Sequence, residues 1–127
     1  MEPQVELMEL TKKAVEENCG IRICLDGTPN DGGVSAEVGA GYIDSQYYTK
    51  EAIRVLQVLF LSKGSDQVEC LDQLGRICNM FQAMRQYPPA ESFTWLDAVT
   101  ATEPNLVGRQ EDGQWIYSAV VNMKIYF

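Results

Sequence analysis

An apolar run of eleven residues at positions 52–62, AIRVLQVLFLS, constrains the fold of this chain more than any other segment. Both alternating sets of side chains in this run are largely apolar, so an extended strand here needs cover on both faces. Such a strand is usually central in its sheet, although the length of the run also permits a helix. The run therefore predicts a buried central element around which the rest of the chain is organised.

The residues that follow this run predict a long amphipathic helix. The sequence KGSD at 63–66 interrupts the apolar run and supplies an N-cap. Apolar residues then recur every three or four positions, which is the spacing of a helix with one buried face. Pro88 and Pro89 end the pattern, so we predict a helix from about Ser65 to Tyr87. The apolar positions are Val68, Leu71, Leu74, Ile77, Cys78, Phe81 and Met84.

The N-terminal half predicts a second helix and one or two short strands. Residues 3–18 are amphipathic, with Pro3 suited to the first turn and a stop at Asn18 and Gly20. Residues 21–25 predict a short strand that leads into a turn-rich segment, and residues 34–38 are compatible with a second strand. The glycine-rich polar segment after them predicts a long loop that extends to Lys50.

The C-terminal third predicts strands that form a hairpin. We expect a strand in the second half of residues 92–102, an interruption at Glu103–Asn105, and a hairpin whose turn is Glu111–Gly113. In the last strand one alternating set is wholly apolar and should face the core, which fixes the register. This set is Trp115, Tyr117, Ala119, Val121, Met123, Ile125 and Phe127.

Together these elements predict an α+β fold. The expected architecture is an antiparallel or mixed sheet of four to five strands with two helices packed on one face. The length of 127 residues fits a single domain over 1–127.

The charged residues exclude several classes of function. The chain has no histidine, which removes Ser-His-Asp and Cys-His catalysis, HExxH zinc sites and mixed cysteine-histidine zinc fingers. Eighteen acidic and ten basic residues give a net charge of −8, so no basic surface for binding the phosphates of nucleic acid is expected. We therefore expect no sequence-specific binding of nucleic acid.

Neither membrane insertion nor a disulfide framework is expected. No stretch approaches the apolar length of a membrane span, and the first residues lack the features of a secretory signal, so a cytoplasmic location is expected. The four cysteines, Cys19, Cys24, Cys70 and Cys78, have no CxxC spacing. Free thiols are the expected state, and a zinc site is not.

Two segments resemble known binding motifs but lack residues that those motifs require. Asp26, Thr28, Asn30 and Glu37 occupy positions 1, 3, 5 and 12 of a calcium loop, but Asp31 stands where that loop requires glycine. The Gly39-Ala-Gly41 sequence has no third glycine and opens no predicted helix, so it does not predict a nucleotide site. We predict no cofactor, no metal and no catalytic set, while a small metal-dependent enzyme or binding module using Asp26–Glu37 remains an alternative.

The predicted loop from Gly39 to Lys50 carries the candidate interface. It is long for a chain whose other connections are short, and it holds Tyr42, Tyr47 and Tyr48. Exposed tyrosines are common in protein interfaces, and a surface loop packed by its own side chains is the competing interpretation. Arg109 and Asp112, at the end of the predicted hairpin, are further interface candidates.

The order of elements and the closing hairpin resemble a family of phage proteins. The C-terminal pattern comprises Pro104, Gly108-Arg109, Asp112-Gly113, Tyr117-Ser118 and Asn122. With the N-terminal helix, the strand before the turn and the central strand before the long helix, it resembles the minor capsid or tail-terminator proteins of tailed phages and prophages. The segment from Gly39 to Tyr48 departs from this family by being richer in glycine and aromatic residues.

The resemblance implies a structural role in a virion and no catalytic activity. Tail terminators form a hexameric ring that caps the tail tube and contacts the head connector while DNA passes through. The resemblance thus implies assembly in the bacterial cytoplasm and a final place in the virion. A head-completion or connector protein is the alternative of the same class.

The uneven distribution of charge adds an expectation about the channel of such a ring. Residues 1–51 hold ten acidic and four basic residues, a net charge of −6, whereas residues 52–127 hold eight and six, a net charge of −2. Negative charge repels DNA and prevents sticking. We therefore expect part of the N-terminal half to face the channel.

Overall fold

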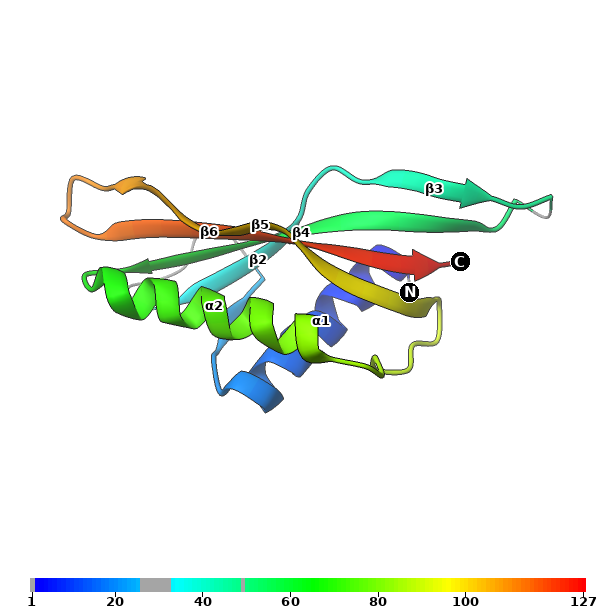
Figure 1. The fold of residues 1–127 in the computed structure, drawn as a ribbon, viewed down its shortest axis with the longest axis horizontal. Helices are drawn as coiled ribbons and strands as arrows, with labels where there is room; N and C mark the ends of the chain where they lie inside the picture. Colours follow the sequence, from blue (N-terminus) through cyan, green and yellow to red (C-terminus); the bar gives the residue numbers. More distant parts are fainter. Residues whose placement is uncertain (1, 26–32, 49) are drawn as a thin grey trace.

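In the computed structural model, described at residues 2–25, 33–48 and 50–127, two helices pack on one face of a six-stranded sheet (Figure 1). The predicted α+β fold is confirmed, with more strands than the four to five expected. The sheet is mixed because β1 and β2 are parallel while the other pairs are antiparallel. The elements are α1 (Pro3–Cys19), β1 (Ile23–Cys24), β2 (Val34–Val38), β3 (Tyr42–Gln46), β4 (Ala52–Gly64), α2 (Gln67–Ala83), β5 (Thr94–Arg109) and β6 (Trp115–Tyr126).

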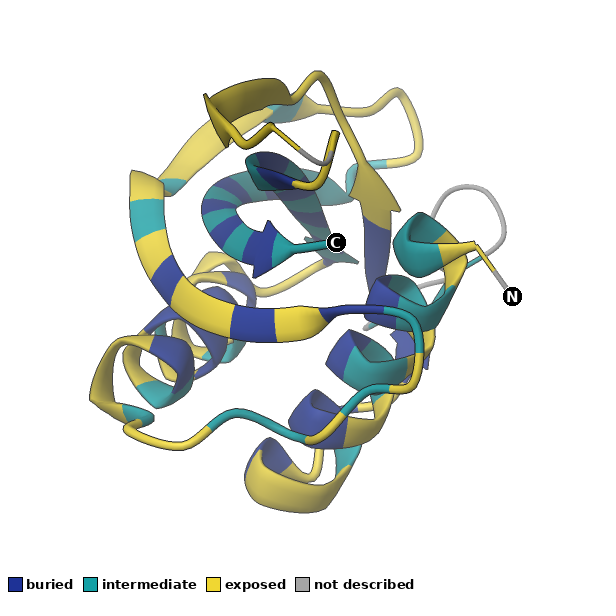
Figure 2. Ribbon diagram, turned by 90° about the vertical axis from the view of Figure 1, so that its right-hand side faces the viewer, coloured by how far each residue is buried: buried dark blue, intermediate teal, exposed yellow. Residues whose placement is uncertain are grey.

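The apolar run at 52–62 forms β4, the central strand of the sheet. It pairs with β6 along one edge and with β2 and β3 along the other. Leu56, Val58 and Phe60 point toward the helices and are buried, whereas Leu59 and Leu61 on the opposite face are only half-buried. The expected cover on both faces was therefore wrong, because both helices lie on the same side of the sheet. β5, which pairs with β6 from Thr94 to Arg109, is strongly curved (Figure 2).

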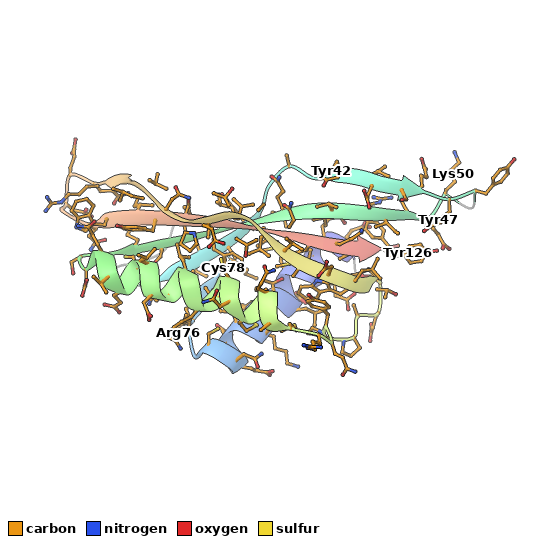
Figure 3. The ribbon with its side chains drawn as sticks, in the orientation of Figure 1. Tyr42, Tyr47, Lys50, Arg76, Cys78 and Tyr126 are labelled. Carbon is orange, nitrogen blue, oxygen red and sulfur yellow. The ribbon has the colours of Figure 1, made fainter. Side chains whose placement is uncertain are left out.

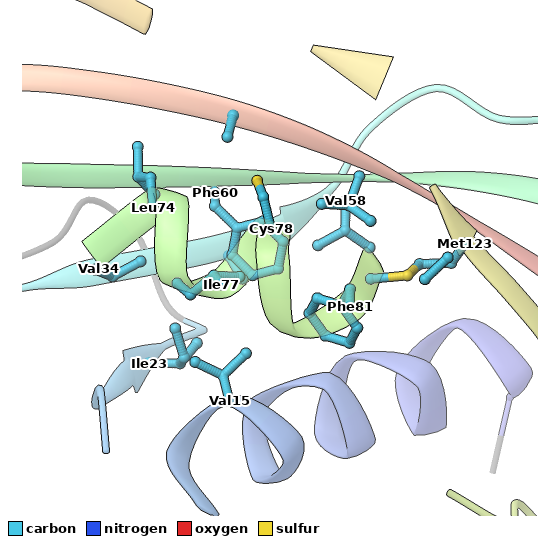
Figure 4. Packing of buried hydrophobic residues seen from close by; sticks show 14 of the residues in the cluster. Val15, Ile23, Val34, Val58, Phe60, Leu74, Ile77, Cys78, Phe81 and Met123 are labelled. Atoms are coloured by element: carbon cyan, nitrogen blue, oxygen red, sulfur yellow. The ribbon is translucent and has the colours of Figure 1, made fainter. Parts of the chain in front are cut away.

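The core lies between the two helices and the sheet (Figure 4). The rings of Phe60 and Phe81 are 6.3 Å apart, and Phe81 is also 6.0 Å from Trp95. In β6 the wholly apolar set faces inward, as predicted: Tyr117, Ala119, Val121, Met123 and Ile125 are buried.

Both helices begin and end near the predicted residues for identifiable reasons. The carboxylate of Asp66 accepts the N–H groups of Val68 at 2.9 Å and Glu69 at 3.5 Å, which caps α2. The end of α2 at Ala83 precedes the predicted Tyr87 because the backbone is already extended at Met84. Gly20, with φ of 66°, ends α1 in the left-handed conformation that glycine adopts easily.

Two other expectations are corrected. The segment from Gly39 to Lys50 is not a loop throughout, because Tyr42–Gln46 forms β3 against the first residues of β4. Glu103–Asn105 does not end a strand, since β5 continues through it with shifts in register between Thr102 and Asn105. The chain accommodates Pro104 there because β5 is an edge strand, where a residue without an N–H group costs no ladder bond.

Three of the four cysteines are buried free thiols, as expected. Cys19, Cys70 and Cys78 are buried. Burial raises the pKa of Cys19 and of Cys78 above the ordinary thiol value, which keeps both protonated and unreactive.

Glu6 of α1 holds the segment that follows α2. Its carboxylate accepts the N–H groups of Glu91 at 3.0 Å and Ser92 at 2.8 Å, and the hydroxyl of Ser92. The Ser92 hydroxyl, followed by these two N–H groups, holds the pKa of Glu6 below its ordinary value of 4.5.

This network predicts a pH dependence of stability. A carboxyl group whose pKa is lowered by folding stabilises the fold above its unfolded pKa, and the stabilisation disappears as the pH falls through the folded pKa. We expect Glu6→Gln to lower Tm at pH 7 and to flatten the fall in Tm below about pH 4.5, measured by circular dichroism. Glu9→Gln, on the exposed side of α1, should retain the wild-type profile. Identical profiles for Glu6→Gln and wild type would show that these hydrogen bonds do not contribute.

Candidate functional site

The candidate site is a projecting hairpin arm, which we define as β3, the described tip residues Tyr47, Tyr48, Lys50 and Glu51, and residues 52–55 of β4. The arm extends from one end of the molecule, beyond the helices (Figure 1). All five residues of β3 are exposed, and among the described strands it pairs with β4 alone. β4 pairs on its other side with β6, so β3 is an edge strand here, and its exposed side chains add little to the core.

The arm is attached through Gly39 and Gly41. The N–H group of Gly39 donates to the carbonyl of Gln57 at 2.7 Å. At Gly41 the chain lies so close to β4 that a Cβ atom would be 2.5 Å from the carbonyl oxygen of Val55. Glycine is therefore required at position 41 for β3 to follow β2 along the same edge of β4.

The three candidate tyrosines all lie on the arm but differ in their surroundings (Figure 3). Tyr47 is half-exposed, and its ring makes an edge contact with Tyr126 of β6 at 5.9 Å. Tyr42 is 57% exposed and Tyr48 is fully exposed. Tyr42 and Tyr48 are thus the better candidates for contact with another molecule, while Tyr47 also helps to fasten the arm.

Polar contacts fasten the arm to β6 as well. The Asp44 carboxylate is 3.3 Å from the ammonium group of Lys124, and the hydroxyl of Tyr126 donates to the carboxylate of Glu51. That hydrogen bond, together with the nearby charge, raises the pKa of Tyr126. At the tip, the N–H of Tyr47 donates to the carbonyl of Glu51 at 2.8 Å and the N–H of Lys50 to the carbonyl of Tyr47 at 3.0 Å. Side-chain contacts with β6 and backbone hydrogen bonds at the tip therefore hold the arm in place.

Arg109 and Asp112 lie at the turn between β5 and β6, at the opposite end of the molecule from the arm (Figure 1). The Arg109 guanidinium group lies 5.0 Å from the centre of the Trp115 ring, and Asp112 forms an ion pair with Lys63 at 3.7 Å. Gly113, with φ of 84°, closes the predicted turn. The structure therefore divides the five candidate residues between two exposed hairpin ends.

Sequence reasoning did not single out Ile43 and Lys50. Ile43 is exposed on β3 beside Tyr42, and two consecutive residues with high strand propensity were a signal that this segment is extended. Lys50 adopts φ of 75° in the turn at the arm tip, which no feature of the sequence indicates.

Other candidate chemistry finds no support in the described residues. Asp26, Thr28 and Asn30 of the candidate calcium loop lie outside them, and no group of three potential metal-ligating side chains is found in the described ranges. Gly39 and Gly41 belong to a strand connection, so they cradle no helix N-terminus. Within the part of the chain that the structure describes, no helix has the length and apolar character needed to cross a membrane.

The fold places the chain among small α+β proteins with two helices on one face of a curved sheet, and a solved structure shares it. A chain of the structure described as the virion of native gene transfer agent (GTA) particle superimposes with a TM-score of 0.69 at 6% sequence identity, and the match covers 97% of this chain and 96% of the other. At this identity the match establishes a common fold. No protein-family model and no curated protein matches the sequence.

Proposed function

We propose that this chain is a structural assembly protein of a phage-like virion, of the tail-terminator kind, with no catalytic activity. Copies form a ring that caps the tail tube and contacts the head connector. The observation that carries the proposal is the nearly full-length fold match to a chain of a virion structure. The resemblance of the ordered elements to tail terminators supports the same assignment.

The projecting arm supports assembly in particular. Tyr42, Ile43 and Tyr48 are large apolar or aromatic side chains on an exposed ribbon, where they add nothing to the core. Exposed aromatic side chains of this kind bury well at interfaces between proteins. The second hairpin end, at Arg109 and Asp112, offers a contact surface on the other side of the molecule.

The charge distribution supports a channel for DNA within the ring. The N-terminal residues 1–51 carry a net charge of −6. Directed toward a channel, this charge would let DNA slide without binding. A ring structure with a neutral or basic channel would contradict this part of the proposal.

Replacing both free tyrosines of the arm tests the assembly role. We expect Tyr42→Ser/Tyr48→Ser to weaken self-association at least about tenfold, because truncating buried aromatic anchors typically costs more than 1.4 kcal/mol. The thermal unfolding midpoint should not change, since neither ring packs in the core. Light scattering over a range of concentrations measures the first effect, and circular dichroism the second.

The matched control is Val68→Ser, which removes an exposed apolar side chain from α2, away from the arm. It should assemble like the wild type. If the double tyrosine variant assembles normally, the arm is not an interface. If the double variant unfolds, the two tyrosines stabilise the fold of the monomer instead.

A further inference from the structure

The structure contains an apolar groove that none of the described side chains fills. It lies between the first turns of α1 and strand β2, with a volume of about 310 Å³. Val5 is 50% exposed and Val38 is 36% exposed at its opening. The lining residues are Gln4, Val5, Met8, Leu25, Ala36, Glu37 and Val38.

Among the described residues that line this groove, Glu37 alone is charged. Its side chain forms no ion pair or hydrogen bond with the described residues. The groove therefore presents aliphatic side chains with one carboxylate beside them. A partner that carries an apolar or aromatic group and a nearby cation complements this arrangement.

The tip of the arm carries that combination. Tyr48 is fully exposed, and Lys50, two residues further on, forms no ion pair within the described part of the chain. The other charged side chains of the arm already have partners: Asp44 pairs with Lys124, Glu51 with Tyr126, and Arg54 lies over the ring of Phe127. The tip therefore offers one aromatic ring and one unpaired positive charge.

The sizes of the two features also agree. An aliphatic cavity of about 150 Å³ holds a benzene molecule, so a groove of about 310 Å³ accommodates the ring of a tyrosine. The phenol hydroxyl can remain at the open side of the groove in contact with water, as tyrosine hydroxyls do at interfaces.

The arm tip cannot reach the groove of its own chain. Val38 lines the groove and Tyr48 follows it by ten residues along a path that is mostly extended. At about 3.3 Å per residue the two positions are roughly 30 Å apart. The pairing of β3 with β4 holds the arm pointing outward (Figure 3). An arm that enters this groove must therefore belong to another copy of the chain.

We propose that the arm tip of one subunit docks in the groove of the next, with Tyr48 among the aliphatic side chains and Lys50 paired with Glu37. The inference rests on the proposed self-assembly and names the contact that produces it. Groove and arm are different surfaces, so the contact is head-to-tail, and repetition of such a contact closes a ring when the rotation between subunits permits it.

A charge exchange tests the contact by sedimentation velocity over a range of concentrations. Lys50→Glu and Glu37→Lys should each weaken self-association by about tenfold or more, since each places like charges together. The double variant restores the opposite pair and should return to within about threefold of the wild type. Single variants that assemble normally, or a double variant no better than either single one, would overturn the proposal.

A mixing experiment tests the head-to-tail geometry. Tyr48→Ser has a defective arm and an intact groove, whereas Val38→Asp has a defective groove and an intact arm. Each alone should be monomeric, and an equimolar mixture should give a 1:1 dimer that grows no further. A mixture that stays monomeric contradicts the proposal, because it indicates an interface of like surfaces. Val5→Asp replaces Val38→Asp if that variant does not fold.

The outcomes separate this inference from the proposed function. If the wild type assembles and all groove variants assemble equally well, the proposed ring remains supported and the proposed contact is wrong. If Glu37→Lys lowers the stability of the monomer without affecting assembly, the groove is occupied from within the same subunit and the contact is again wrong. If the wild type remains monomeric at every concentration, both the contact and the proposed ring fail.

Discussion

Phe81→Ala should lower the free energy of unfolding by about 3–5 kcal/mol, the largest effect that we expect from a single substitution in this chain. Phe81 is fully buried in α2 and contacts the rings of Phe60 in β4 and Trp95 in β5. Its removal leaves a cavity where the helix joins two strands of the sheet. Urea denaturation followed by circular dichroism measures the change.

The matched control lies on the same helix. Val68→Ala shortens a side chain that is three-quarters exposed, and it should change the free energy of unfolding by less than about 0.5 kcal/mol. A loss below about 1 kcal/mol for Phe81→Ala would mean that α2 does not pack on the sheet as described.

Gly41→Ala should detach the arm and weaken assembly. The added Cβ atom would lie 2.5 Å from the carbonyl oxygen of Val55 and 2.9 Å from the Leu56 side chain, too close for real atoms. Because the first of these neighbours is the backbone of the central strand, β3 must move instead, at a cost of about 1–3 kcal/mol. We expect faster hydrogen exchange in Tyr42–Gln46 and the loss of self-association.

Gly39→Ala is the control for this prediction. The nearest atom to its added Cβ would be the carbonyl oxygen of Gln57 at 3.7 Å, an ordinary contact. This variant should keep both the protection of β3 and the wild-type assembly. Equal behaviour of the two glycine variants would show that close approach at position 41 does not fix the arm.

The elements that sequence reasoning predicted correctly are those with a strong internal pattern. The helical spacing after Asp66 and the apolar alternation in β6 each imply one buried face, and the structure places both faces in one core. Asp66 and Gly20 end their helices by local geometry that depends on a few neighbouring residues. Such signals need no knowledge of the rest of the fold.

The arm was misjudged because its strand has no buried face. All five residues of β3 are exposed, so no alternation between apolar and polar positions marks them. Gly39 and Gly41 were interpreted only as loop residues, whereas Gly41 also allows the chain to pass close to β4. The groove could not be predicted from the sequence, since its lining comes from three segments that only the fold brings together.

The candidate interface residues were chosen from composition. Tyrosines in a segment without core positions suggested a surface with another purpose, and the structure leaves more than half of the Tyr42 side chain and all of the Tyr48 side chain exposed. Their contact with another subunit stays a prediction.

Electron microscopy of the purified wild-type protein tests the central claim, that copies assemble head-to-tail into a ring. We predict closed rings of one uniform subunit number with an open central channel, which appear as the protein concentration rises and are absent for Tyr42→Ser/Tyr48→Ser. Monomers at every concentration, open filaments of variable length, or rings that persist in the tyrosine variant would contradict the account.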